Sequence, residues 1–309
     1  MYDLAIVGGG PAGVAAGVYA ARKQLKTVFI TDSFGGQSID SAEIQNWIGT
    51  PTISGLNLAK NFETHLRAYA GDTVDIKLGV RAQKLEKKVG VFSIQTSGGE
   101  FEARAVLVVT GGIRRKLEAK GAAEFENKGV TYCASCDGPM FGGQDVVVVG
   151  GGNAGFETAA QLLAYAKSVT LLHRSAEFTK ADALTVEAVL KHPNMKTLTN
   201  SCPVEIKGSN FVSSVVVENT KTGEKSEIPA AGVFVEIGML PSTDFVKGVI
   251  ELDQLGRVVT NPKNQHTSVE GVWAAGDCTD ELYHQNNIAA GDGVKALEDI
   301  YFWIKAHSA

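Results

Sequence analysis

The strongest constraint on the fold of this chain is an internal repeat. Residues 5–31 read AIVGGGPAGVAAGVYAARKQLKTVFIT and residues 147–173 read VVVGGGNAGFETAAQLLAYAKSVTLLH, so the two segments align without a gap. Each copy contains a short apolar run, the pattern G-x-G-x-x-G, a stretch rich in small residues and a second apolar run. This order predicts a strand, a glycine turn, a helix and a second parallel strand, twice in one chain.

The glycines of such a turn have separate roles. The first allows the sharp turn, the second lets the backbone approach a pyrophosphate, and the third lets the helix pack on the strand. The N-terminus of the helix adds unpaired N–H groups and the positive end of its dipole. We therefore expect each copy to bind a dinucleotide. The predicted contacts are Gly8, Gly10, Pro11, Ala12 and Gly13 in the first copy, and Gly152, Asn153 and Ala154 in the second.

The residue after the second apolar run of each copy indicates which ribose is recognised. In the first copy it is Asp32, and a carboxylate suits the free 2′-hydroxyl of FAD or NAD. In the second copy it is Arg174, flanked by His173 and Ser175, and a guanidinium suits a 2′-phosphate. The contrast predicts FAD on the first copy and NADPH on the second, with NADH as the alternative.

The last segment of the chain is too short to form a third domain. Its apolar strand Gly271–Ala275 ends at Gly276 and Asp277, where ligands bind in open α/β sheets. The simplest architecture adds this segment to the first nucleotide-binding unit. We therefore predict an α/β protein with two doubly wound, Rossmann-like domains, the second inserted into the first. The FAD-binding domain would comprise 1–113 and 245–309, the NAD(P)H-binding domain 117–240, and the hinges about 113–117 and 240–245.

Cys133 and Cys136 are separated by two residues and lie within the inserted domain. Cysteines at this spacing can form a redox-active disulfide. A zinc site would need a second pair of ligands, whereas Cys202 and Cys278 are solitary and the histidines show no ligand spacing. We therefore predict a redox pair and no metal. Asp137 is a candidate acid that protonates a leaving thiolate, and the alternative is a capping role in the following turn.

Composition and charge disfavour several classes of function. The net charge is −5, from 29 basic and 34 acidic residues, and the chain has no basic cluster of the kind that binds nucleic acid. No apolar run reaches the roughly 18–20 residues that span a bilayer. Because the first residues already read as a strand, we expect no signal peptide and a cytoplasmic protein.

Across essentially its whole length the chain resembles the low-molecular-weight thioredoxin reductases and the catalytic part of the alkyl hydroperoxide reductase flavoprotein. The most specific feature is CASCDG at 133–138, just ahead of the second glycine fingerprint. The other segments that carry the resemblance are GGGPAG at 8–13, GGQ at 35–37, GGGNAG at 150–155, AAGD at 274–277, and Gln285.

The resemblance implies roles for individual residues. It makes Cys136 the thiol that faces the flavin, Cys133 the thiol that attacks the partner disulfide, and Asp137 the acid. It implies NAD(P)H on the loop that begins at Gly150, and a homodimer. It places the contacts to FAD at the Gly8 loop, Gly36, Gln37, Asn46, Gly276, Asp277, and His284, Gln285 and Asn286.

The chain departs from the family pattern at three places. Where the family reads H-R-R-x-x-x-R, residues 173–179 read HRSAEFT, which keeps one arginine. The segment Pro139-Met140-Phe141 is closer to the peroxidase flavoprotein than to the aromatic segment common in thioredoxin reductases. Residues 284–287 read HQNN in place of a basic or apolar pattern around the glutamine. The departures leave the pyridine nucleotide and the partner open.

We predict a flavin-dependent thioredoxin-disulfide reductase that passes electrons from NADPH, through FAD and the Cys133–Cys136 disulfide, to a thioredoxin-like protein. The alternative is a disulfide reductase driven by ferredoxin or NADH that serves a peroxiredoxin system. Because the flavin strand begins near the first residue, we expect the dithiol carrier to be a separate protein. The nicotinamide and the disulfide must both reach the flavin, so we expect the domains to rotate about the hinges.

Overall fold

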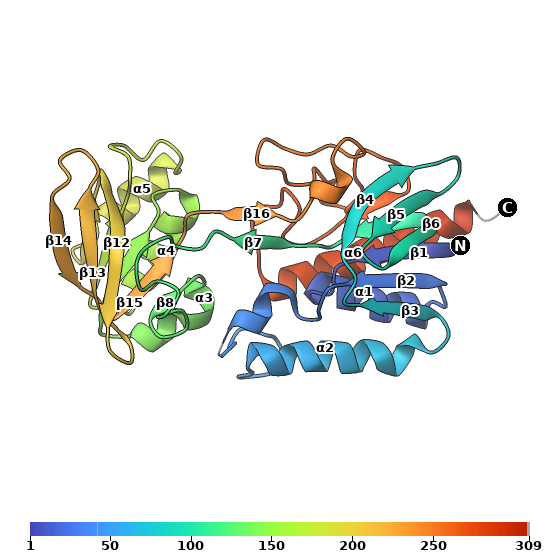
Figure 1. Cartoon of the computed structure of the whole chain (residues 1–309), viewed down its shortest axis with the longest axis horizontal. Helices are drawn as coiled ribbons and strands as arrows, with labels where there is room; N and C mark the ends of the chain where they lie inside the picture. Colours follow the sequence, from blue (N-terminus) through green and yellow to red (C-terminus); the bar gives the residue numbers. More distant parts are fainter. Residues whose placement is uncertain (42, 308–309) are drawn as a thin grey trace. The chain divides into compact units, whose positions relative to one another are not determined.

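The computed structural model describes residues 1–41 and 43–307, which form two compact units (Figure 1). Of these residues, the first unit comprises 1–41, 47–113 and 240–307, and the second comprises 43–46 and 114–239. In Figure 1 the first unit is mostly blue, cyan and red, and the second is mostly green and yellow. The long middle segment of the chain is therefore inserted into the first unit.

The first unit is built on a seven-stranded sheet with the order β3-β2-β1-β6-β5-β4, in which β17 also pairs with β6. The pairs β1–β2, β2–β3, β1–β6 and β6–β17 are parallel, whereas β4–β5 and β5–β6 are antiparallel. The strands are β1 (Tyr2–Val7), β2 (Thr27–Thr31), β3 (Val74–Leu78), β4 (Ala82–Lys87), β5 (Phe92–Thr96), β6 (Gly99–Val108) and β17 (Val272–Ala274). The first glycine turn therefore follows a central strand of a mainly parallel sheet.

Small residues let the helices of the first unit approach one another closely. Helix α1 (Pro11–Arg22) packs against both α2 (Gly55–Ala70) and α6 (Asn286–Ala306). A Cβ added at Gly293 of α6 would lie 2.2 Å from the carbonyl oxygen of Ala12 in α1. Such a distance leaves no space for a side chain at Gly293.

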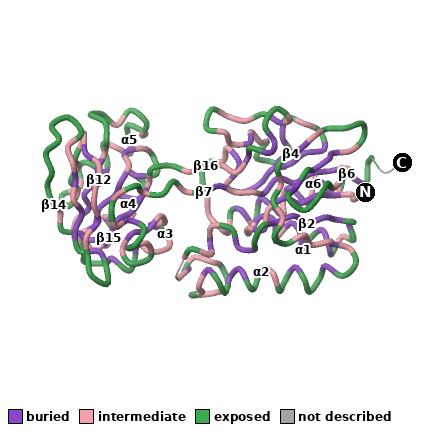
Figure 2. Tube along the Cα trace, viewed as in Figure 1, coloured by how far each residue is buried: buried purple, intermediate pink, exposed green. Residues whose placement is uncertain are grey.

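The core of each unit lies along its parallel strands. In β1, Leu4, Ala5 and Ile6 have no exposed surface, and Figure 2 shows the same burial in the central strands of both units. A parallel strand covered on both faces needs a continuous apolar run instead of an alternating pattern. This is the run that precedes each glycine turn in the sequence.

The second unit contains a five-stranded, all-parallel sheet with the order β11-β10-β9-β15-β8 and a separate antiparallel sheet with the order β12-β13-β14. The parallel strands are β8 (Val130–Thr131), β9 (Asp145–Val149), β10 (Ser168–Leu172), β11 (Met195–Leu198) and β15 (Gly232–Val235). The antiparallel strands are β12 (Ser201–Gly208), β13 (Val212–Asn219) and β14 (Lys225–Pro229). The helices are α3 (Ala134–Asp137), α4 (Asn153–Leu163) and α5 (Ala183–Leu190).

Two short strands, β7 (Gly112–Arg114) and β16 (Met239–Pro241), pair where the chain leaves and re-enters the first unit. Hydrogen bonds extend this pairing, with the Arg115 N–H donating to the Gly238 carbonyl at 3.0 Å and the Ser242 N–H donating to the Gly111 carbonyl at 2.9 Å. The part of the chain that the structure describes also contains the 3-10 turns η1 (Gly36–Asp40), η2 (Gly138–Phe141) and η3 (Asp244–Val246).

The predicted fold class is confirmed, because two parallel-sheet α/β units are present and the second is inserted into the first. Among the described residues, no helix is long and apolar enough to cross a membrane.

Candidate functional site

Cys133 and Cys136 form a disulfide, as predicted, with their Cα atoms 5.3 Å apart. Cys133 is the N-cap of the one-turn helix α3, and its Sγ accepts a hydrogen bond from the Cys136 N–H at 3.2 Å. The carbonyl of Cys133 accepts a second one from the Asp137 N–H at 3.0 Å. The short helix therefore holds both sulfurs and the predicted acid in one turn of backbone.

The carboxyl of Asp137 is half-buried and tied to a neighbour that the sequence analysis missed. The Thr131 hydroxyl donates a short hydrogen bond to Oδ2 of Asp137, and it accepts the Cys133 N–H at 3.3 Å. Burial raises the pKa of Asp137 above its usual range, Thr131 and Arg114 oppose that rise, and Glu43 adds to it. A carboxyl with a raised pKa keeps its proton to higher pH, which suits the role of an acid beside a disulfide.

The first glycine fingerprint forms a turn with an open space at its second glycine. An added Cβ would lie 2.1 Å from the Val109 carbonyl oxygen at Gly8 and 2.0 Å from the Gly8 carbonyl oxygen at Gly13, whereas at Gly10 it would meet nothing within 4 Å. Pro11 begins helix α1, so the turn leads directly into the N-terminus of a helix. The residues present therefore fit a pyrophosphate, which needs free backbone space at this position.

Other predicted FAD contacts gather around this turn. Gly36 begins η1 with a φ of +57°, and an added Cβ there would lie 3.4 Å from the Gly10 Cα. Gln37 donates a hydrogen bond to Oδ2 of Asp277 at 3.4 Å. The turn after β17 is close as well, because a Cβ at Gly276 would lie 3.3 Å from that of Ala12.

The start of helix α6 joins the same cluster. Asn286, its first residue, accepts a hydrogen bond from the Ser38 hydroxyl of η1 at 2.9 Å, and Gln285 is the N-cap. The buried Nε2 atom of His284 has no hydrogen-bond partner within residues 1–41 and 43–307. An unpaired buried nitrogen at the edge of this cluster is a group that a bound ligand would satisfy.

The two remaining predicted FAD contacts are Asp32 and Asn46. The carboxylate of Asp32 is exposed and forms an ion pair with Arg81 at 2.6 Å, an arrangement in which solvent screens most of the attraction. Asn46 belongs to the segment 43–46, which is assigned to the second unit. The roles of both residues stay predictions.

The second fingerprint repeats the geometry of the first. An added Cβ would lie 2.1 Å from the Glu236 carbonyl oxygen at Gly150 and 1.9 Å from the Gly150 carbonyl oxygen at Gly155, but it would meet nothing within 4 Å at Gly152. Asn153 and Ala154 begin helix α4, and the Asn153 Oδ1 accepts the Asp182 N–H at 2.7 Å. The side chain of Asn153 thus also forms a hydrogen bond with the loop that follows β10.

The predicted ribose-reading residues lie directly after β10. The Nε2 atom of His173 is 2.9 Å from the Glu177 carbonyl oxygen, and its ring centroid is 5.0 Å from that of Phe178. Arg174 and Ser175 are exposed, and neither side chain has an ion pair or hydrogen bond with any described residue. The unpaired guanidinium of Arg174 is therefore available to bind a phosphate. The carboxylate of Asp32, at the same position of the first repeat, is instead already paired with Arg81.

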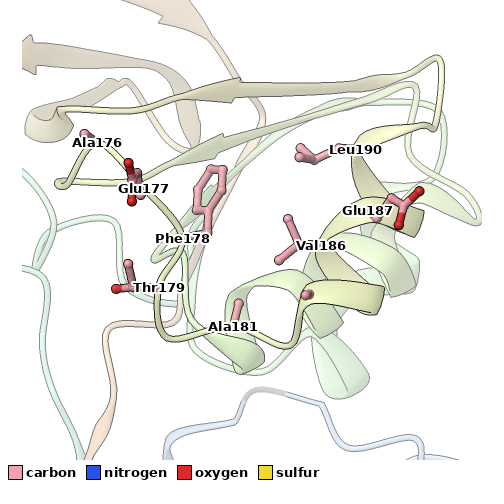
Figure 3. A pocket seen from close by; sticks show the side chains of 9 residues that line it. Ala176, Glu177, Phe178, Thr179, Ala181, Val186, Glu187 and Leu190 are labelled. Atoms are coloured by element: carbon pink, nitrogen blue, oxygen red, sulfur yellow. The ribbon is translucent and has the colours of Figure 1, made fainter.

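A cavity of about 660 Å³ lies nearby, between the loop after β10 and helix α5 (Figure 3). Its wall is mainly apolar and includes Phe178, Val186 and Leu190, with Glu177 and Glu187 at its margin. None of the predicted site residues lines this cavity.

Glu236 is the second residue that the sequence analysis missed. It follows β15, is half-buried, and its Oε1 accepts a hydrogen bond from the Thr158 hydroxyl of α4 at 2.9 Å. Burial raises the pKa of Glu236 to about 7, Arg114 opposes this rise, and Glu157 adds to it. The available signal was an acid directly after a buried apolar strand.

Comparisons with known proteins identify the same family that the sequence motifs indicate. The family model described as "Pyridine nucleotide-disulphide oxidoreductase" matches residues 2–293. The F subunit of alkyl hydroperoxide reductase from Escherichia coli (strain K12) is 38% identical over 297 residues, which are 96% of this chain and 57% of that protein. A protein named NADH dehydrogenase, from Bacillus subtilis (strain 168), is 38% identical over 296 residues, with the same coverage of 96% and 57%. The chain spans a little over half the length of these relatives.

Solved structures similar to this chain include two thioredoxin reductases. The one from Streptococcus pyogenes MGAS5005 has a TM-score of 0.90 and 34% identity, and the match covers 99% of both chains. The one from Giardia duodenalis has a TM-score of 0.92 and 33% identity, and the match covers 98% of this chain and 99% of that one. The resemblance inferred from the motifs is confirmed.

Proposed function

Because the chain belongs to the pyridine nucleotide-disulphide oxidoreductase family, we propose that it is a thioredoxin-disulfide reductase that uses NADPH and FAD. The observation that carries this proposal is the Cys133–Cys136 disulfide, which lies beside an acid of raised pKa in the unit that holds the second fingerprint. The likeness to two thioredoxin reductases over nearly the whole chain supports the same activity.

FAD would be held by the cluster around the first fingerprint. The open space at Gly10 would admit its pyrophosphate, and Gly36, Gln37 and Asp277 stand around the same turn. His284 offers a buried nitrogen that has no partner within the described ranges. When bound, FAD supplies an acceptor for the hydride of NADPH and a donor of two electrons to the disulfide.

The cysteines and Asp137 would carry out the exchange with the partner. Two electrons and two protons convert the disulfide into the thiols of Cys133 and Cys136. The Cys133 thiolate then attacks a partner disulfide, forming a mixed disulfide and releasing one partner thiol. The Cys136 thiolate attacks the Cys133 sulfur, which re-forms the internal disulfide and releases the second partner thiol. Asp137, whose pKa is raised by burial, would supply a proton to the leaving thiolate.

NADPH would bind on the second fingerprint, with Arg174 and Ser175 at its 2′-phosphate. Both side chains are exposed and unpaired in the part of the chain that the structure describes, so binding would break no existing ion pair. Charge-assisted contacts of this kind discriminate phosphate from hydroxyl strongly.

The second candidate function is a disulfide reductase driven by NADH or ferredoxin that serves a peroxiredoxin system. The curated relatives favour it, since the alkyl hydroperoxide reductase protein and the protein named NADH dehydrogenase each match 96% of the chain. The homodimer that the family resemblance implies stays a prediction, and so does the cytoplasmic location.

An anaerobic titration separates these candidates. The flavin absorbance of the holoenzyme is followed during addition of NADPH, NADH or reduced ferredoxin, and thioredoxin is then added to the reduced enzyme. We expect NADPH to bleach the flavin at one equivalent and thioredoxin to restore its colour. Bleaching by NADH alone or by ferredoxin alone would favour the second candidate, and reduced enzyme that thioredoxin cannot reoxidise would contradict the proposed partner.

A further inference from the structure

Glu236 lies beside the first glycine of the second fingerprint. Strands β9 and β15 are parallel neighbours with Val149 opposite Val235, so Gly150 and Glu236 follow them side by side. The Glu236 N–H donates to the Val149 carbonyl at 2.8 Å, and a Cβ added at Gly150 would lie 2.1 Å from the Glu236 carbonyl oxygen.

This position is the switch point of the sheet. In the order β11-β10-β9-β15-β8, strand β9 lies between β10, which follows it in the chain, and β15, which comes much later. The strand order therefore reverses direction between β9 and β15. Open α/β sheets bind their ligands outside the carboxyl ends of the strands at such a point. The residues predicted to read the ribose on the adenosine half, His173 to Ser175, follow β10. The opposite half of a dinucleotide bound in this way would cross toward β15.

The side chain of Glu236 is held in place at this point. Its Oε1 accepts a hydrogen bond from the hydroxyl of Thr158, which is 6% exposed and lies on helix α4. The charged groups that act on it are Arg114 at the end of β7 and Glu157 on α4. Glu236 is therefore an oriented, half-buried acid next to the second fingerprint. The thiol–disulfide exchange proposed for Cys133 and Cys136 does not involve it.

We propose that Glu236 lies beside the nicotinamide half of the bound pyridine nucleotide and that its ionised carboxylate favours the oxidised nucleotide over the reduced one. The inference rests on the proposed function, since it requires a pyridine nucleotide on the second fingerprint. The oxidised ring carries a positive charge and the reduced ring carries none, while the phosphates are common to both. A nearby negative charge therefore stabilises the bound oxidised ring and has no comparable effect on the uncharged reduced ring.

The ionisation of Glu236 makes this preference depend on pH. Since its pKa is raised to about 7 by burial, the carboxyl is neutral in mildly acidic solution and ionised in mildly alkaline solution. By linkage, the oxidised nucleotide lowers the pKa of Glu236, so its affinity relative to the reduced nucleotide rises as the pH rises through neutrality. Ionised Glu236 would thus assist the ring as it loses hydride.

Calorimetric titrations of the holoenzyme test the inference without turnover. The probes are NADP⁺ and tetrahydro-NADP, a reduced analogue with an uncharged ring that donates no hydride. We expect the affinity ratio of NADP⁺ to the analogue to increase by up to about tenfold between about pH 6 and about pH 8.5. Glu236→Gln keeps the side-chain shape and should make the ratio independent of pH. The 2′-phosphate titrates in both probes and cancels in the ratio.

A matched control is Glu187→Gln, which removes an exposed carboxylate of α5 that pairs with Lys191 at 2.6 Å. This variant should retain the pH dependence of the wild type. A pH-independent ratio in the wild type, or an unchanged pH dependence in Glu236→Gln, would overturn the inference and leave the proposed function intact. Failure of both probes to bind at any pH would overturn the nucleotide part of the proposed function together with the inference.

Discussion

The hydroxyl of Thr131 donates a hydrogen bond to Oδ2 of Asp137 and accepts the backbone N–H of Cys133. One side chain thus connects the predicted acid to the first cysteine of the disulfide. This hydrogen bond lowers the pKa of Asp137 against the effect of burial. Thr131 therefore orients the carboxyl and also sets how readily it gives up a proton.

Thr131→Val should weaken the exchange step. Loss of the hydroxyl moves the pKa of Asp137 further up, which makes it a weaker acid and frees its carboxyl to rotate. We expect reoxidation of the reduced enzyme by thioredoxin to slow roughly tenfold, with its alkaline limb moved to higher pH. Stopped-flow measurements across pH would show this. Thr131→Ser keeps the hydroxyl and should retain the wild-type profile, so equal losses in both variants would contradict the role.

Cys136→Ser should separate the two halves of the reaction. The flavin should still be reduced by NADPH, because hydride transfer precedes the disulfide, but electrons should not continue to thioredoxin. Flavin bleaching and insulin-coupled thioredoxin reduction measure the two steps. Cys202→Ser, which alters a cysteine outside the disulfide, is the control and should leave both steps unchanged. Thioredoxin reduction by Cys136→Ser at the wild-type rate would rule out the disulfide as the relay.

Arg174→Ala should affect NADPH and spare NADH. A charge-assisted contact to phosphate contributes about 1.5–3 kcal/mol, so kcat/KM for NADPH should fall roughly tenfold to a hundredfold. Lys191→Ala removes a cation of α5 that is paired with Glu187 and should change neither value. Equal losses for both nucleotides in Arg174→Ala would show that the side chain supports structure and does not read the phosphate.

Gly10→Ala and Gly152→Ala should each remove one ligand and leave the other. We expect the wild-type protein to purify yellow, with one FAD per chain. A Cβ at either position meets no protein atom within 4 Å, so both variants should keep the melting temperature of the apoprotein. The methyl group would instead occupy the space of a pyrophosphate, so Gly10→Ala should purify with less FAD and Gly152→Ala should bind NADP⁺ more weakly. Normal FAD content in Gly10→Ala would contradict the assignment of the first fingerprint.

Glu236→Gln should stabilise the protein in neutral and alkaline solution. The pKa of Glu236 is raised from 4.5 to about 7 in the folded state, so the folded protein holds a proton that the unfolded chain has lost. The stabilisation is therefore fully present below the unfolded pKa and is lost as the pH rises through the folded pKa, and it amounts to roughly 3 kcal/mol. The difference in melting temperature between the variant and the wild type should grow between about pH 4.5 and about pH 7 and then remain constant. A difference that is the same at every pH would contradict the raised pKa.

The sequence by itself determined the class of fold and the local parts of the site. Each fingerprint lies within one contiguous strand–turn–helix segment, so the close packing of Gly13 against Gly8 and the open space at Gly10 follow from residues close together in the chain. The disulfide is equally local, because its cysteines are three positions apart. Local geometry of this kind is readable as a motif, since the same backbone turn always needs the same residue types.

Only the tertiary structure decided which distant side chains meet at these local parts. Glu236 reaches Thr158 across 78 positions of sequence, and Gln37 reaches Asp277 across 240. No spacing rule connects such pairs, since their proximity depends on strand order. The exposed Asp32 paired with Arg81, a residue that no motif marked. Because the sheet places β9 between β10 and β15, an acid that looked like an ordinary strand end in the sequence became a neighbour of the second glycine turn.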